Sequence, residues 1–237
     1  MLALLLALLL PFVGCGLDAA ARPGAVRADA AVSDQPAQKL IALTFDDGPR
    51  RSTTTALLDG LKQRGVRATF FLIGQQVPGN EDLVQRMDAE GHQVGLHTYD
   101  HVMLTGLNAA DFSAQVDRSR ALLTSVLGRS DFLLRPPYGM VDDGVKKRAR
   151  APLLLWSIDP QDWDDKNTQR IVEHVVSRAG DGDVILLHDI YSTSVEAALQ
   201  IVDALHQRGF LFVTADELFA QRHIALENGA VYRSART

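Results

Sequence analysis

Residues 40–49 read LIALTFDDGP, and this stretch decides the fold. Its short apolar run is typical of a buried strand, and it stops at two carboxylates followed by a Gly-Pro turn. Similar runs recur along the chain, at residues 68–73, 93–97, 131–135, 153–158, 184–188 and 210–213. Each run has the length of a single buried strand.

Stretches with the features of helices separate these runs. Three of them start at a capping side chain, Ser52, Asn80 or Asn108, and end near a glycine, spanning residues 52–65, 80–91 and 108–128; two more span 168–179 and 195–208. The alternation predicts repeated strand–helix units, and therefore an α/β fold with a parallel sheet. About seven pairs favour a barrel with fewer than the usual eight units or an open, doubly wound sheet.

The composition excludes several classes of protein. With 237 residues the chain is long enough for one full-sized domain. A hydrophobic share of 46% and a charged share of 22% lie near globular averages, which excludes a disordered chain or a polytopic membrane protein. The formal net charge is -5, with both signs interleaved and no basic stripe, so nucleic acid is not expected as a partner.

The first residues indicate export. An unbroken apolar run at residues 1–13 precedes Gly14-Cys15-Gly16; it is too short to span a bilayer and fits a signal segment. It is either an ordinary signal peptide or a lipoprotein signal, in which Cys15 would become a lipidated membrane tether. Both alternatives place the protein in the periplasm or outside the cell, lipid-anchored in the second case. Cys15 is the only cysteine, so an intramolecular disulfide is excluded.

These observations predict the domain organisation. Residues 1–16 are expected to be the signal, and residues 17–38, rich in alanine and without apolar periodicity, a flexible linker. A single domain follows at residues 39–222, and residues 223–237 are expected to be a C-terminal tail. The oligomeric state is left open.

Side chains that can bind a metal ion or transfer a proton follow several of the predicted strands. Asp46 and Asp47 end the first run, and His97, Arg135 and His188 end later ones. Because the carboxyl ends of parallel strands form one rim in an α/β barrel, we expect these residues to converge on one site.

Two histidines and two carboxylates could build a metal site. The spacing of His97 and His101 aims both imidazoles at a common point if they share a helical turn. One carboxylate of Asp46 and Asp47 could complete the site while the other acts as a base; ordinary turn chemistry is the alternative. Two histidines and one aspartate leave open positions on a divalent ion, as a hydrolytic site requires.

Three further segments carry candidate groups. Residues 135–139, RPPYG, hold Arg135 and the Tyr138 amide on a stiff backbone. Residues 156–163, WSIDPQDW, combine aromatic and acidic side chains, and residues 184–189, VILLHD, place His188 after a buried strand. A rigid loop, a core tryptophan and a buried histidine are the respective structural alternatives.

Taken in order, five segments resemble the five motifs of the polysaccharide deacetylase family, also called the NodB-homology domain or carbohydrate esterase family four. They are residues 44–49, 97–101, 135–139, 156–163 and 184–189, and the resemblance covers roughly residues 39–219. Residues 210–214 followed by Glu217-Leu218 resemble the closing strand and helix of that family. The resemblance implies a distorted (β/α) barrel of about seven parallel strands.

The resemblance also implies roles for individual residues. Asp47, His97 and His101 would bind a divalent metal ion, zinc or a similar ion such as cobalt, and Asp46 would be the general base. Arg135 would orient Asp46, and the Tyr138 amide would stabilise the oxyanion. His188 would be the general acid, oriented by Asp162 in preference to Asp159. Trp163 and Leu186 would line the acetyl pocket.

The activity implied is metal-dependent hydrolysis of N-acetyl groups from a polysaccharide that contains N-acetylglucosamine, with release of acetate. Peptidoglycan, chitin oligomers and exopolysaccharide remain open as the acetylated polymer. The alternatives are a hydrolase of a small non-sugar amide on the same fold and a non-catalytic carbohydrate-binding relative. A metalloprotease is disfavoured because Thr98 stands where the glutamate of His-Glu-x-x-His would be.

Overall fold

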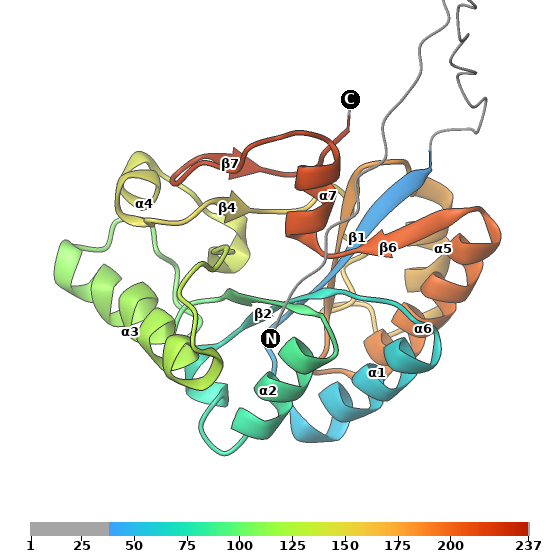
Figure 1. Cartoon of the computed structure of the whole chain (residues 1–237), viewed down its shortest axis with the longest axis horizontal. Helices are drawn as coiled ribbons and strands as arrows, with labels where there is room; N and C mark the ends of the chain where they lie inside the picture. The colour runs from blue at the N-terminus through green and yellow to red at the C-terminus, as the bar shows by residue number, and fades with distance from the viewer. Residues whose placement is uncertain (1–37, 237) are drawn as a thin grey trace, which may run out of the picture. The chain divides into compact units, whose positions relative to one another are not determined.

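The computed structural model describes residues 38–236 (Figure 1). The expected signal at residues 1–16, with Cys15, and the linker up to residue 37 lie outside the described residues. The described residues form one compact unit. Within the described part of the chain, no helix combines the length and the apolar character needed to cross a membrane.

A parallel sheet forms the centre of the domain. Its strands are β1 (Lys39–Asp46), β2 (Thr69–Leu72), β3 (Gln93–Leu96), β5 (Asp183–His188) and β6 (Phe210–Val213). The first strand, β1, pairs with β5 along one edge, and its other edge is shared by β6 at the amino end and β2 at the carboxyl end. The sheet therefore brings the carboxyl ends of β1, β2, β3 and β5 to one rim.

Isolated bridges close this sheet into a ring. Leu134 bridges to Leu96 at the end of β3 and to Leu153 in β4 (Leu153–Leu154), and Ile158 bridges to Ile185 in β5. The fold is thus the distorted (β/α) barrel, as predicted, and the open sheet is excluded. The expected strands at 131–135 and 153–158 are much shorter than predicted.

The side chain of Arg135 explains these short strands. Its guanidinium donates to the carbonyls of Leu154 and Leu155, which a regular ladder would otherwise use. Two prolines, Pro136 and Pro137, follow directly and lack the N–H groups needed to continue a strand. A buried side chain thus replaces part of the backbone pairing on this side of the barrel.

The helices surround the barrel. Five were expected and are found: α1 (Arg51–Gln63), α2 (Glu81–Ala89), α3 (Ala109–Leu127), α5 (Thr168–Arg178) and α6 (Ser192–Gln207). Asn108 caps α3 as predicted, because its side chain accepts the N–H of Asp111. Asn80 occupies the N-cap position of α2, as predicted, but its side chain donates to the carbonyl of Gln76 and makes no capping hydrogen bond. The expected cap Ser52 is wrong, because Ser52 lies inside α1.

Two further α-helices are short: α4 (Asp143–Arg148) and α7 (Ala215–Gln221). Thr214 and Glu217 form a capping box at the start of α7. The buried side chains Ala215, Leu218 and Phe219 of α7 join a cluster that includes Leu40 and Ala42 of β1 and Phe71. Because side chains alternate along a strand, Thr44 and Asp46 share this inner face of β1. The barrel interior is therefore apolar near α7 and becomes polar towards the rim.

Residues after 222, expected as a tail, pack against the domain. The short strand β7 (Val231–Tyr232) pairs in parallel with β4, and Ala235 is buried. Arg236 donates to both oxygens of the buried Asp183 at 2.6 and 2.7 Å. Figure 1 shows this last segment running beside β4 and α7.

Candidate active site

The predicted residues converge on the rim of the barrel. Asp46 is the last residue of β1, and its register partner in β5 is His188. Between them opens a cavity of about 360 Å³. It is lined by Asp46, Asp47, His97, His101, Tyr138, Trp156, Asp159, Trp163, Leu186 and His188.

Three side chains at this cavity are placed to share a cation. One ligand atom from each of Asp47, His97 and His101 lies within 4.8 Å of the others. Asp47 Oδ1 is 3.3 Å from His101 Nε2 and 3.5 Å from His97 Nε2. That oxygen is buried and has no hydrogen-bond partner among the described residues. A buried acceptor without a donor fits an electropositive ligand.

Both histidines turn their Nε2 atoms toward Asp47 Oδ1. The Nδ1 of His97 lies 2.7 Å from the carbonyl of Arg135; because a carbonyl can only accept, this contact selects the neutral tautomer with the proton on Nδ1 and a lone pair on Nε2. Burial, and then the neighbouring His97, lower the pKa of His101 and favour its neutral form. Two imidazoles and a carboxylate are a donor set suited to zinc or a similar ion, so these residues fit the expected metal.

The segment between the two histidines differs from the expected helical turn. Residues 97–101 form an irregular turn in which Thr98 and His101 have left-handed backbones, with φ of 65° and 57°. Asp47 is also left-handed, with φ of 74°. The imidazoles converge because of this turn geometry, and not because of helical spacing.

Asp46 is buried beside the metal ligands. Its Oδ1 accepts from Arg135 Nη1 at 2.7 Å, and its Oδ2 lies 3.6 Å from His97 Nε2. Arg135 is fully buried and also donates to Thr44 Oγ1 at 2.9 Å. Its guanidinium lies 4.1 Å from the centre of the Phe71 ring. These contacts fix the direction in which Asp46 faces the cavity.

Thr44 is a contributor that the sequence reading missed. Its hydroxyl donates to the carbonyl of Ile185 at 2.6 Å and accepts from Arg135. The available signal was a polar residue inside an apolar strand, two positions before Asp46 and therefore on the same face.

His188 lies across the cavity and is bound by Asp162. The Nδ1 of His188 is 2.8 Å from Asp162 Oδ1. Burial lowers the pKa of His188, but the hydrogen bond and charge of Asp162, with the charges of Asp46 and Asp47, more than offset it and raise the pKa to about 9. The imidazole therefore carries a proton at neutral pH.

The two acidic candidates of the fourth segment have different contacts. Asp162 is fully buried and hydrogen-bonds to His188, as preferred from the resemblance. Asp159 lines the cavity and accepts the backbone N–H of Gln161 at 2.8 Å. Burial raises the pKa of Asp159.

Apolar and aromatic side chains form the rest of the cavity wall. Leu186 is buried, whereas Trp163 and Tyr138 have exposed fractions of 48% and 62%. The Tyr138 ring lies edge-on to His101 with ring centres 4.9 Å apart, and the Tyr138 backbone is left-handed, with φ of 61°. Trp156, for which a core position was the alternative, also lines the cavity.

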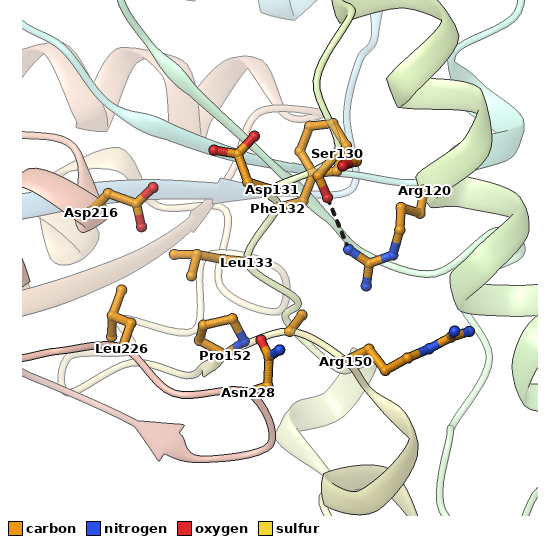
Figure 2. Close-up of a pocket in the computed structure, with 11 residues that line it drawn as sticks. Arg120, Ser130, Asp131, Phe132, Leu133, Arg150, Pro152, Asp216, Leu226 and Asn228 are labelled. Carbon is orange, nitrogen blue, oxygen red and sulfur yellow. Dashed lines mark hydrogen bonds between the residues drawn. The ribbon is translucent and has the colours of Figure 1, made fainter.

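A second cavity of about 330 Å³ lies away from these residues, beside the segments that precede β4 and Leu134 (Figure 2). Figure 2 shows Arg120 and Arg150 on one side and the carboxylates of Asp131 and Asp216 on the other. Both arginines already have partners: Arg120 donates to two carbonyls and Arg150 to Asp117. With mixed charges and engaged guanidinium groups, this cavity is not a second candidate site.

Comparison with known proteins agrees with the geometry at the rim. Residues 33–152 match the family model described as polysaccharide deacetylase. The chain belongs to the polysaccharide deacetylase family. This match includes the three candidate metal ligands, Asp46, Arg135 and Tyr138, whereas His188 and Asp162 lie beyond it.

Members of this family resemble the chain over most of its length. It is 41% identical to the peptidoglycan-N-acetylmuramic acid deacetylase PdaC of Bacillus subtilis, over 77% of this chain and 39% of that protein. A peptidoglycan-N-acetylglucosamine deacetylase of Bacillus cereus is 36% identical over 78% of this chain and 91% of its own length. The chain thus spans about two fifths of the length of the Bacillus subtilis relative.

A solved structure of the family superimposes closely. It is a family 4 acetyl xylan esterase from Clostridium thermocellum, in complex with a cobalt ion. The TM-score is 0.80 at 27% sequence identity, and the match covers 84% of this chain and 100% of the other. The barrel described above is therefore the fold of this family.

Proposed function

We propose that this protein is a metal-dependent deacetylase that hydrolyses N-acetyl groups on the amino sugars of a polysaccharide and releases acetate. One observation carries the proposal: a candidate metal triad, a carboxylate paired with Arg135 and a protonated histidine all face one cavity at the barrel rim. Amide hydrolysis needs an activated water, a stabilised oxyanion and a proton for the leaving nitrogen. The cavity offers groups for each need.

Asp47, His97 and His101 would hold the metal ion, for which we propose zinc, with cobalt as a substitute. When bound, a divalent cation supplies Lewis acidity that polarises a carbonyl and acidifies water. The second hydrogen bond of His97, to the Arg135 carbonyl, would keep its ring in the tautomer that binds a cation.

Asp46 would act as the general base and take the proton from the attacking water. Its buried pairing with Arg135 holds one oxygen, so the other is left to face the cavity. The backbone N–H of Tyr138 would donate to the oxyanion that develops on the acetyl group. The stiff Pro136-Pro137 segment before it limits the reorganisation needed.

His188 would act as the general acid that protonates the sugar nitrogen as the amide bond breaks. With a pKa raised to about 9, it holds that proton at neutral pH. Asp162 would orient the ring through Nδ1 and leave the opposite nitrogen for the substrate.

The substrate is proposed to be an acetylated amino-sugar polymer, with peptidoglycan first. The cavity wall combines the exposed rings of Trp163 and Tyr138, which can pack on sugar faces, with the buried Leu186, which suits an acetyl methyl. The names of two relatives specify peptidoglycan. We further propose that residues 1–16 export the protein, either as an ordinary signal peptide or as a lipoprotein signal with Cys15 as the site of lipid attachment, because peptidoglycan lies outside the cytoplasmic membrane.

The test is acetate release by the purified chain from peptidoglycan and from N-acetylglucosamine oligomers, with and without a chelator, beside Asp46→Asn. Release that the chelator and the variant both abolish supports the proposal. Acetylated xylan and a small acetamide serve as comparison substrates, because release from either one alone would identify an esterase or a small-amide hydrolase. No release from any substrate by the metal-loaded chain would favour a binding role.

A further inference from the structure

The turn that carries both candidate histidines is held by a side chain from α3. The backbone N–H groups of Tyr99 and Asp100 both donate to Gln115 Oε1, at 3.1 and 2.9 Å. Gln115 Nε2 in turn donates to Asp100 Oδ2 at 2.9 Å. One partly buried amide therefore makes three hydrogen bonds to two successive residues between His97 and His101.

The same turn has further contacts with residues 74–75 and with α3. The N–H groups of Gly74 and Gln75 donate to the carbonyls of Thr98 and Tyr99, at 2.9 and 3.0 Å. The guanidinium of Arg118, one helical turn after Gln115 on α3, lies 3.4 Å from the centre of the Tyr99 ring. The Tyr99 ring is thereby engaged with α3.

This support has a physical reason. Left-handed backbone at a residue other than glycine is unfavourable and persists only when its surroundings enforce it. Thr98 and His101 both have such backbones, on either side of the residues that Gln115 binds. Without these hydrogen bonds the turn would relax, and His101 Nε2 would move relative to Asp47.

We propose that Gln115 is a positioning residue that sets the metal affinity of this site, although it contacts neither the ion nor the substrate. The inference rests on the proposed metal site and extends it to a residue on α3. Gln115 suits the role because its amide combines an acceptor for two N–H groups with a donor for a carboxylate. A glutamate there would place its second oxygen against Asp100.

That charge conflict allows a matched set of variants. Gln115→Leu removes all three hydrogen bonds, and Gln115→Glu creates the repulsion with Asp100. Combining Gln115→Glu with Asp100→Asn reverses the polarity of the pair and restores a donor opposite an acceptor. Gln200→Leu is the control, because Gln200 is an exposed helical glutamine that donates to Glu196 on its own helix.

The measurement is the zinc affinity of the purified chain, from competition with a chromogenic chelator, together with the visible spectrum of the cobalt-loaded protein. Both are recorded well below the unfolding temperature of each variant. Gln115→Leu and Gln115→Glu are expected to lose roughly 10–100-fold in zinc affinity, as for other groups that orient ligands. The double variant is expected to recover most of the loss, with a cobalt spectrum like that of the wild type.

Wild-type zinc affinity and cobalt spectrum in a folded Gln115→Leu variant would overturn the inference. So would a double variant as weak as Gln115→Glu. If Gln115→Leu does not fold, the comparison of Gln115→Glu with the double variant decides. A wild-type chain that binds zinc, shows these losses and releases no acetate would leave the positioning role intact and refute the proposed activity.

Discussion

Asp162 binds His188 at two points: Oδ1 lies 2.8 Å from the imidazole Nδ1, and Oδ2 accepts the His188 backbone N–H at 2.8 Å. One buried carboxylate thus fixes both the ring and the end of β5 that carries it. The same contact contributes to the raised pKa of His188.

The first prediction concerns this pair. Asp162→Asn removes the charge while burial persists, so the pKa of His188 should fall well below its value of about 9. The alkaline limb of kcat/KM for acetate release should move to lower pH, and activity at pH 8 should fall by roughly 100-fold or more, as for loss of a general acid. A pH–rate profile measures both effects.

Asp159→Asn is the matched control for this profile. Asp159 lines the same cavity but accepts from Gln161 and interacts with His188 only through its charge, so its variant should move the alkaline limb much less than Asp162→Asn does. An unchanged limb in Asp162→Asn would contradict the assignment of His188 as the acid.

The second prediction concerns the buried guanidinium. Arg135→Lys keeps the charge but leaves the carbonyls of Leu154 and Leu155 without donors. Each unsatisfied buried group costs about 1–3 kcal/mol, so the free energy of unfolding should fall measurably in urea. Arg170→Lys, at an exposed ion pair with Asp165, should change it by less than about 0.5 kcal/mol. Equal free energies of unfolding for Arg135→Lys and Arg170→Lys would show that the guanidinium hydrogen bonds of Arg135 are dispensable for stability.

The third prediction concerns Asp189, which is buried and has one oxygen without a partner among the described residues. Burial raises its pKa to about 7, against a lowering hydrogen bond from Thr54. The folded protein therefore binds this proton more tightly than the unfolded chain, and stability falls as pH rises from about 4 to about 7. Asp189→Asn should be more stable than the wild type at pH 8 and should lose this advantage near pH 4.

Thermal unfolding of the metal-free protein at several pH values measures this effect. About 1 kcal/mol corresponds to roughly 2–4 °C in a chain of this size, so the gain at pH 8 is detectable. A constant difference between the variant and the wild type across the pH range would refute the assignment.

The fourth prediction concerns the last residues of the chain. Arg236→Ala removes two hydrogen bonds from the fully buried Asp183, and should lower the free energy of unfolding by about 1–3 kcal/mol. Removal of residues 223–237 should cost more, because β7 and the buried Ala235 are lost as well. Arg233→Ala, at an exposed position, is the control for chemical denaturation. A truncated chain as stable as the full one would contradict this packing.

Much of the fold and the site could be predicted because the signals are local. Strand ends that carry Asp46, His97 and His188 can be recognised from apolar runs that stop at a polar residue. The topology of parallel strands then brings those ends together without further information.

Features that depend on distant partners could not be predicted. Strand β7 has two residues and pairs with β4, far away in the sequence, so it has no periodic pattern of its own. Gln115 looks like any helical glutamine until the turn of His97 and His101 is placed beside it. The expected strand at 131–135 is shorter for the same reason: its length depends on a distant contact, the hydrogen bond from the Arg135 side chain to the carbonyl of Leu154.

The buried guanidinium of Arg135 contacts both Phe71, a member of the apolar cluster near α7, and Asp46 at the rim. On the α7 side, Phe219 and its neighbours form a buried apolar cluster in which a change of side-chain volume is destabilising. On the rim side, the loops after the strands carry exposed rings such as Tyr138 and Trp163. The loops can therefore change in sequence while Asp46, held by the buried Arg135 below them, keeps its orientation, so the cavity wall can vary independently of the buried residues beneath it.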